Sequence, residues 1–315
     1  MQKTKEKTAK KTTIGGQALI EGVMMRGVSK TAMASRLPDG TIDVETWDTE
    51  SEKSGKWFRK TPFVRGIFNL IDSLTLGYKC LMKSAEKAGF EDEEPSKFEL
   101  KLKELFGDKF MSVVTGFAGV LGVVLAIVLF MLVPTYLVKL VEYLAGGIGF
   151  WKNILEGAIK ICIFIGYLAV ISKMGEIKRV FEYHGGEHKS IFCYEAGKEL
   201  TVENARNSIR FHPRCGTSFL LIVLVISILV FSLVPWGNGL LRVVYKLILL
   251  PVVVGIAYEL IKLAGRYDNI ATRIISAPGL WLQRLTTREP DDSQLEVALA
   301  ALKAVLPKEG EDDTW

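Results

Sequence analysis

Four long apolar stretches constrain the fold of this chain more than any other feature. Residues 111–133 and 216–241 contain no charged side chain. Residues 154–172 and 243–261 carry charged side chains only near their ends. About 20 apolar residues in a helix are enough to cross ~30 Å of hydrocarbon, and a helix satisfies its own backbone hydrogen bonds. We therefore predict a mainly α protein with four helical membrane spans.

The charged side chains inside these stretches have ordinary explanations. Glu156 and Lys160 are four residues apart with the acid first, which is the favourable order for an ion pair on a helix. Lys246 and Glu259 lie near opposite ends of the fourth stretch, where long side chains usually reach the membrane interface. Few buried charges are therefore expected in the spans, which argues against a transport pathway.

The distribution of charge predicts how the spans are oriented. Hydrophobic residues make up 49% of the chain and charged residues 24%, so the two kinds must occupy different segments. The net charge of +5 is mild and does not indicate nucleic-acid binding. Basic residues concentrate in residues 173–216, whereas the loops on the other side hold only Lys139 and Lys152. By the positive-inside rule, both termini and this central loop are predicted to be cytosolic.

Periodicity predicts several elements outside the spans. Residues 31–47 alternate around a Pro-Asp-Gly turn, which is typical of a β-hairpin. The glycines of residues 14–27 indicate tight turns and close backbone packing. One amphipathic helix is predicted to begin with Thr61 as its N-cap, and a second covers residues 97–110.

The region after the fourth span contains two further signals. Residues 276–288 are typical of an interfacial stretch, with Trp281 among basic flanks, and a capping box from Ser293 to Glu296 opens a helix that ends near Leu306. We divide the chain into a disordered basic tail (1–13), a cytosolic glycine-rich and hairpin region (14–60), amphipathic helices (61–110), spans one and two (111–172), a cytosolic His/Cys loop (173–216), spans three and four (217–262), and a cytosolic C-terminal region with a helix and an acidic tail (263–315).

The central loop carries the residues with the clearest chemistry. It holds all three histidines of the chain and two of its four cysteines. His184 and His188 would share one face of a helix, and Cys215 follows His212 by three residues. Imidazole and thiolate ligands suit a divalent transition metal, zinc above all, which takes about four of them. We predict a metal site formed by His184, His188, His212 and Cys215, with Glu187 as the general base.

Other interpretations of the same residues stay open. Residues 184–188 satisfy the H-x-x-E-H pattern of one class of metalloprotease. Each glycine in that pattern weakens a helix by roughly 1 kcal/mol, and no further carboxylate ligand can be assigned downstream. Histidines grouped in a loop by accident are the simplest alternative to a metal site. Arg210 and Arg214 are candidates for binding phosphate groups, or for anchoring the loop at lipid headgroups.

Several long segments of the chain resemble a known family. They are IGGQALIEGVMMRG near the start, EYHGGEHKSIFCYEAGKELTVENAR and RFHPRCGTSFL in the middle, and GLWLQRLTTREPDDSQLEVALAAL near the end. Together they resemble the YqhQ-like proteins, a bacterial family of unknown function. The resemblance implies a multi-pass protein of the bacterial inner membrane, described as a predicted metal-dependent enzyme. The family commonly has alanine at the position of Gly186, a difference that leaves every potential ligand in place.

Two classes of function follow from these features. The first is a metal-dependent enzyme, hydrolase-like, that acts on a substrate at the membrane surface. The second is a non-enzymatic membrane scaffold whose metal site is structural and whose cytosolic face binds a partner protein. The lipid bilayer is the expected partner in both cases and nucleic acid in neither. The substrate and the oligomeric state are left open.

Overall fold

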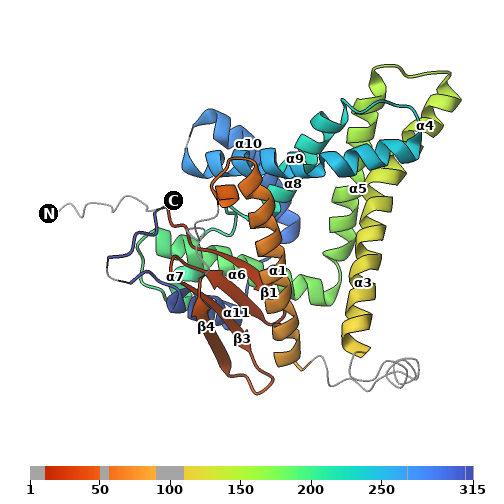
Figure 1. Cartoon of the computed structure of the whole chain (residues 1–315). Coiled ribbons are helices and arrows are strands. Elements are labelled where there is room, and N and C mark those ends of the chain that lie inside the picture. The colour runs from red at the N-terminus through yellow and green to blue at the C-terminus, as the bar shows by residue number, and fades with distance from the viewer. Residues whose placement is uncertain (1–10, 50–56, 90–109, 268, 309, 315) are drawn as a thin grey trace. The chain divides into compact units, whose positions relative to one another are not determined.

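The computed structural model describes residues 11–49, 57–89, 110–267, 269–308 and 310–314. Within them the chain is mainly helical, with a small sheet near the N-terminus, as predicted (Figure 1). Most of the predicted basic tail and nearly all of the predicted helix over residues 97–110 lie outside the described residues. Backbone contacts divide the chain into two compact units: the first comprises Met1–Phe90, Leu168–Val223 and Val254–Trp315, and the second Glu91–Tyr167 and Leu224–Val253.

The sheet is an antiparallel meander whose strands follow one another in chain order. The predicted hairpin is confirmed, and Gly40 takes a φ of 85° in its turn, a conformation that favours glycine. The glycine-rich segment before it forms a second hairpin, which the sequence did not predict, because glycine is a poor strand former. The strands are β1 (Gly15–Leu19), β2 (Gly22–Arg26), β3 (Lys30–Arg36) and β4 (Ile42–Asp48).

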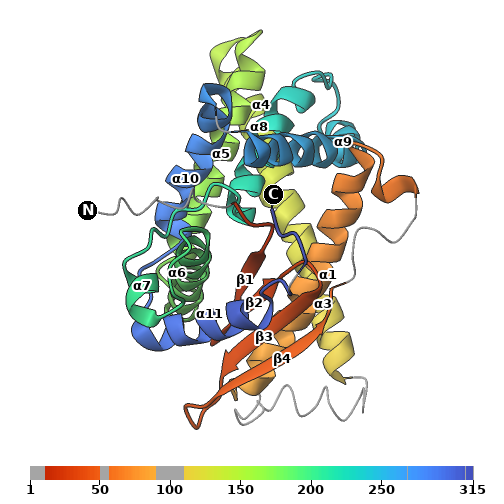
Figure 2. The same cartoon turned by 90° about the vertical axis from the view of Figure 1, so that its left-hand side faces the viewer.

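Helices cover both faces of this sheet (Figure 2). Because side chains alternate along a strand, Val23 and Met25 of β2 pack on one side with the helices α6 and α11. Met24 points to the other side, where it meets Met33 and the α1 residue Cys80. The two inner strands are therefore apolar on both faces. The helices are α1 (Val64–Lys87), α6 (Gly175–Glu195) and α11 (Asp292–Ala304).

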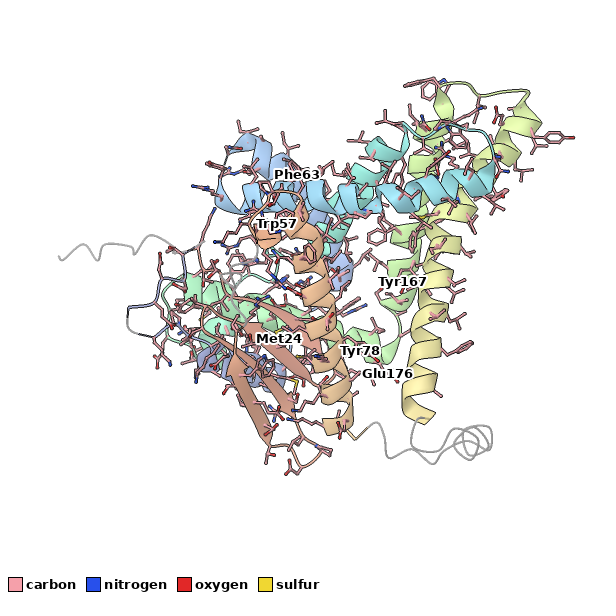
Figure 3. All side chains as sticks on the ribbon, in the orientation of Figure 1. Met24, Trp57, Phe63, Tyr78, Tyr167 and Glu176 are labelled. Atoms are coloured by element: carbon pink, nitrogen blue, oxygen red, sulfur yellow. The ribbon has the colours of Figure 1, made fainter. Side chains whose placement is uncertain are left out.

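Helix α1 begins later than the sequence predicted. Its first helical residue is Val64, and Phe63, not Thr61, occupies the cap position with a φ of 66° and no side-chain capping bond (Figure 3). The backbone N–H of Phe63 donates instead to Glu259 Oε1 at 3.1 Å, and Arg65 pairs with the same carboxylate. A distant acid thus satisfies the free N–H at the start of the helix, which a local capping pattern cannot reveal.

The largest correction concerns the predicted cytosolic loop. Most of it is helical, as α6 and the short α7 (Val202–Arg206). Helix α6 lacks a clean apolar stripe, and its buried positions include Gly186, Glu187 and His188. These residues are buried because α6 packs against both the sheet and α11, so tertiary packing determines the helix where its apolar periodicity is weak.

Two helices form the C-terminal region of the first unit. The stretch predicted to be interfacial is part of α10 (Ile270–Thr286). The final helix α11 carries a capping box as predicted, but it runs from Asp291 to Gln294, two residues before the predicted one. Its apolar stripe, including Leu295 and Leu302, is fully buried.

Three helices are long and apolar enough to cross a membrane, within the part of the chain that the structure describes. They comprise Gly116–Ala145, which contains a π-helical turn at Val128–Leu132, and the helices α5 (Trp151–Ile171) and α9 (Gly239–Arg266). The fourth predicted span is shorter than expected. Helix α8 (Gly216–Phe231) has 16 residues, or ~24 Å, because the chain turns near Pro235 before α9 begins. Four full spans are therefore not confirmed.

The second unit buries a group of charges, and one of them, Lys246, was predicted to reach the interface. Lys246 is 0% exposed and forms an ion pair with Glu156, so its predicted reach to the interface is wrong. Arg242 Nη2 donates to the same carboxylate at 2.8 Å, and Lys160 lies 3.8 Å from it. One carboxylate thus holds three cations in the interior of this unit.

Candidate metal centre

Two histidines of α6 and one cysteine converge on a common point. His184 and His188 are one helical turn apart, and their ring centroids lie 4.5 Å from each other. Cys215 precedes α8, and its Sγ lies 3.1 Å from His184 Nε2. One ligand atom from each of the three residues lies within 4.8 Å of the other two. The two histidines therefore share one face of a helix, as their i, i+4 spacing predicted.

Backbone carbonyls fix the orientation of both imidazole rings. His184 Nδ1 is 2.8 Å from the carbonyl oxygen of Thr286, and His188 Nδ1 is 2.5 Å from that of Arg210. A carbonyl can only accept, so each Nδ1 carries a proton, and each Nε2 is the ring nitrogen left to bind a cation once it is unprotonated. Metal-binding histidines usually donate their second N–H in this way. The arrangement therefore prepares both Nε2 atoms to bind a cation beside the thiol.

The electrostatics of the group favour a thiolate. Burial alone would raise the pKa of Cys215, but His184 and His188 outweigh it and hold that pKa well below its ordinary value. Burial likewise opposes charge on His184, yet the adjacent Cys215 and Glu187 raise its pKa to about 9. The thiolate is the form of cysteine that binds metals. The donor set, with two imidazoles and one thiolate, fits a zinc-type ion.

Glu187 lies beside this group in a nearly closed environment. Its side chain is 7% exposed, and one carboxylate oxygen is 3.9 Å from His184 Nε2. Burial raises the pKa of Glu187, although both histidines and the backbone N–H of Gly16 oppose that rise. A Cβ at Gly16 would lie 2.9 Å from Glu187 Cγ, so glycine in β1 leaves room for the acid. A carboxyl with a raised pKa is suited to proton transfer near neutral pH.

Among the described residues, His212 is not one of the three whose ligand atoms converge. Its main chain is held by Gln283, which accepts from His212 N and donates to His212 O, both at 2.7 Å. Its ring nitrogens face Arg214 and, at 3.9 Å, Glu195. Among the described residues, the converging ligand atoms belong to His184, His188 and Cys215. The assignment of His212 as a ligand therefore stays a prediction.

Cys193, the other cysteine of this region, is also separate. It is fully buried in an apolar cluster with Ala205, Leu295 and Leu299. Its Sγ donates weakly to the carbonyl of Glu199 at 3.5 Å. Cys193 is therefore a core residue that connects α6 with α7 and α11.

Glycine is required at one of the two positions between the histidines. A Cβ at Gly185 would lie 1.9 Å from the carbonyl oxygen of Arg288, so the chain after α10 rests directly on the helix backbone. A Cβ at Gly186 would lie 3.6 Å from its nearest neighbours, which is ordinary contact. The close approach at Gly185 places the end of α10 where the Thr286 carbonyl can reach His184.

Sequence reasoning missed the groups that hold the centre in place. The carbonyls of Thr286 and Arg210 act through the backbone, so their side chains give no signal. Gln283 is fully buried and clamps the His212 segment, but a lone glutamine in an amphipathic stretch carries no signal either.

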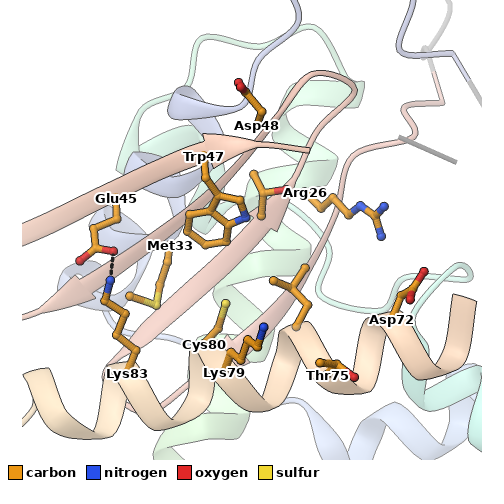
Figure 4. Close-up of a pocket in the computed structure, with 12 residues that line it drawn as sticks. Arg26, Met33, Glu45, Trp47, Asp48, Asp72, Thr75, Lys79, Cys80 and Lys83 are labelled. Atoms are coloured by element: carbon orange, nitrogen blue, oxygen red, sulfur yellow. Dashed lines mark hydrogen bonds and ion pairs between the residues drawn. The ribbon is translucent and has the colours of Figure 1, made fainter. Parts of the chain in front are cut away.

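A separate cavity lies between the sheet and α1 (Figure 4). It has a volume of about 460 Å³, with Met33, Trp47 and Cys80 among its apolar lining. Several of its charged side chains already have partners, since Glu45 pairs with Lys83 and Asp72 with Arg59. It contains none of the residues of the His/Cys group.

The fold and the centre together define a class: a mainly helical protein with candidate membrane spans and a mixed α/β unit that carries a buried His/His/Cys cluster. Residues 61–308 match the family described as "Protein of unknown function (DUF1385)". The chain is also 37% identical over 294 residues to the "Uncharacterized protein YqhQ" of Bacillus subtilis (strain 168), covering 93% of this chain and 92% of that protein. The chain belongs to this family of unknown function, and the resemblance seen in the sequence is confirmed. No solved structure matches it.

Proposed function

We propose that this protein is a metal-dependent enzyme whose centre lies at the cytosolic surface of the membrane. One observation carries the proposal: two histidines with carbonyl-bound Nδ1 atoms present their Nε2 atoms beside the Sγ atom of Cys215. Structural zinc sites usually have four protein ligands, whereas catalytic sites have three and leave a position for substrate. Three converging ligands within the described residues favour the catalytic class over the structural one.

The residues of the centre suggest a division of roles. His184, His188 and Cys215 would hold a divalent ion such as zinc, which supplies a Lewis acid when bound. Glu187 would accept and return a proton, since its buried carboxyl lies 3.9 Å from His184 Nε2. The walls around it exclude water, because Glu187, His188 and Cys215 are each less than 9% exposed. This combination is typical of metal-assisted hydrolysis, and we favour that reaction class.

Metal analysis of the purified protein tests the proposal. The wild-type chain is expected to bind about one transition-metal ion, as a single site of this type would. His184→Ala combined with His188→Ala is expected to abolish binding, because it removes two of three ligands. An absence of metal in the wild type, after reconstitution with zinc, cobalt and iron in turn, would contradict the proposal.

His212→Ala serves as the matched control for this measurement. It removes an imidazole of the same region whose nitrogens face Arg214 and Glu195. Retained metal in His212→Ala supports an open centre with three ligands. Loss of metal would make His212 a fourth ligand and would favour the structural role, in a membrane scaffold, over catalysis.

The proposed location rests on the apolar helices and the basic central region. The positive-inside rule supports a cytosolic location for the chain between α5 and α8. In intact cells, a Lys198→Cys variant is therefore expected to resist a membrane-impermeant maleimide, whereas Tyr143→Cys is expected to be labelled. Both positions are exposed, and both variants are made in a background without the native cysteines. The reverse labelling pattern would contradict the orientation.

A further inference from the structure

A second, smaller pocket adjoins the backbone that orients the two histidines. Its volume is about 230 Å³, and it is lined by Ser172, Arg210, Arg284, Leu285, Thr287, Arg288 and Glu289. The Arg210 carbonyl binds His188, and Leu285 and Thr287 flank the Thr286 carbonyl that binds His184. The pocket and the His/Cys centre therefore share two backbone segments.

The lining of the pocket has an excess of positive charge. Three of its side chains are arginines, and Glu289 is its one carboxylate. Glu289 is already engaged twice, with Arg210 Nη1 at 2.7 Å and with Lys189 Nζ at 2.8 Å. The negative charge of Glu289 is therefore balanced by Lys189 and Arg210, and not by the other two arginines of the pocket.

The remaining pair, Arg284 and Arg288, has no carboxylate partner among the described residues. Arg288 Nη2 donates to the carbonyl of Ser172 at 2.8 Å, and its Nε is buried without any partner in the described part of the chain. Arg284 is exposed, and no described residue accepts a hydrogen bond from it. Guanidinium groups match the oxygens of phosphate with two parallel N–H bonds.

The surface next to the pocket is suited to a membrane interface. Ile270, Ile274 and Trp281 are exposed by 63% or more on α10. Their spacing puts them on one face of the helix, and Arg284 continues that face one turn later. Ser172 directly follows α5, a candidate membrane span. Exposed tryptophan and isoleucine beside arginine are typical of helices that lie at lipid headgroups.

We propose that this pocket binds the phosphate group of an anionic ligand. That group belongs either to a lipid headgroup or to a soluble phosphorylated molecule. The volume fits a phosphate with a few attached atoms, since pockets for drug-sized ligands begin at roughly 300 Å³. A second consequence rests on the function proposed above. If the His/Cys centre is catalytic, the pocket indicates that the substrate of that centre carries a phosphate group.

Binding measurements on the full-length protein in zwitterionic nanodiscs test this proposal. One arm titrates glycerol 3-phosphate by calorimetry, and the other measures phosphatidylglycerol retained against phosphatidylcholine by native mass spectrometry. Arg284→Gln combined with Arg288→Gln is expected to weaken the phosphate-bearing probe about tenfold or more, as loss of charge-assisted hydrogen bonds would. Binding of glycerol 3-phosphate identifies a soluble ligand, and binding of phosphatidylglycerol alone identifies a lipid headgroup.

Two variants keep the result interpretable. Arg284→Gln alone removes an exposed side chain that has no partner among the described residues, so it tests the pocket without disturbing the fold. Arg266→Gln removes the same charge at the end of α9, outside the pocket, and is expected to change binding less than about twofold. Failure of both probes to bind, or binding that is equal in the wild type and Arg284→Gln, overturns the proposal.

The test also separates this pocket from the metal centre. His184→Ala combined with His188→Ala is expected to lose metal and to keep binding the phosphate probe. A wild-type protein that binds phosphate through Arg284 without any metal would contradict the proposed enzyme and support the pocket. Metal without arginine-dependent phosphate binding would contradict the pocket and leave the enzyme standing.

Discussion

Replacing Glu156 with glutamine is expected to lower the free energy of unfolding by about 3–5 kcal/mol, because it leaves buried charges without their partner. The side chain is 4% exposed and its oxygens contact Arg242, Lys246 and Thr135. Glutamine keeps the shape of the side chain but removes the negative charge that faces these cations. Thermal or denaturant unfolding in detergent, followed by circular dichroism, measures the change.

Glu142→Gln is the matched control within the same unit. Glu142 pairs with Lys152 near the surface, where its side chain is 32% exposed, so its loss is expected to cost less than about 1 kcal/mol. Adding Lys246→Met to Glu156→Gln should recover part of the loss, since it removes one unpaired cation. Equal destabilisation by the two glutamine variants, or no recovery, would show that the buried ion group is not what stabilises this unit.

Gly185→Ala is expected to destabilise the protein by about 3 kcal/mol, because the new methyl group overlaps the chain after α10. The added Cβ would lie 1.9 Å from the Arg288 carbonyl, and a carbonyl cannot move away as the end of a side chain can. Its displacement would also shift Thr286, whose carbonyl orients His184. We therefore expect weaker metal binding as well as a lower melting temperature.

Gly186→Ala provides the comparison at the next residue of the same helix. Its Cβ would lie 3.6 Å from the nearest atoms, so the gain in helix propensity, about 1 kcal/mol, should appear as higher stability with unchanged metal binding. The two alanine variants differ by one position and are expected to have opposite signs. Similar effects of both would contradict the close approach of the α10–α11 connection to α6.

The candidate centre illustrates how far residue spacing leads. His184 and His188 could be placed on one helix face from their separation alone, and His212 and Cys215 were predicted as the further ligands by their chemistry. The main chain of His212 is held by the side chain of Gln283. That clamp joins residues 71 positions apart, and no local pattern carries it.

The spans show the same division between local and long-range information. Apolar length identified the candidate spans, because the hydropathy of a helix is a property of consecutive residues. It could not show that Lys246 turns inward, because that depends on Glu156 lying on another helix. A lysine in a span stays in the interior only where an acidic partner is buried beside it, and otherwise reaches the membrane interface.

By itself, the sequence determined the mainly helical class, the β3–β4 hairpin, the apolar helices and the helical phase of the histidine pair. These are local properties, set by composition and by spacing along one element. Only the tertiary structure decided that the His/Cys region is a buried helix, which ring nitrogens are presented, and which arginines have no carboxylate partner among the described residues. Those features arise where α6 meets the sheet, α10 and α11, and contacts between distant segments are not encoded in any local period.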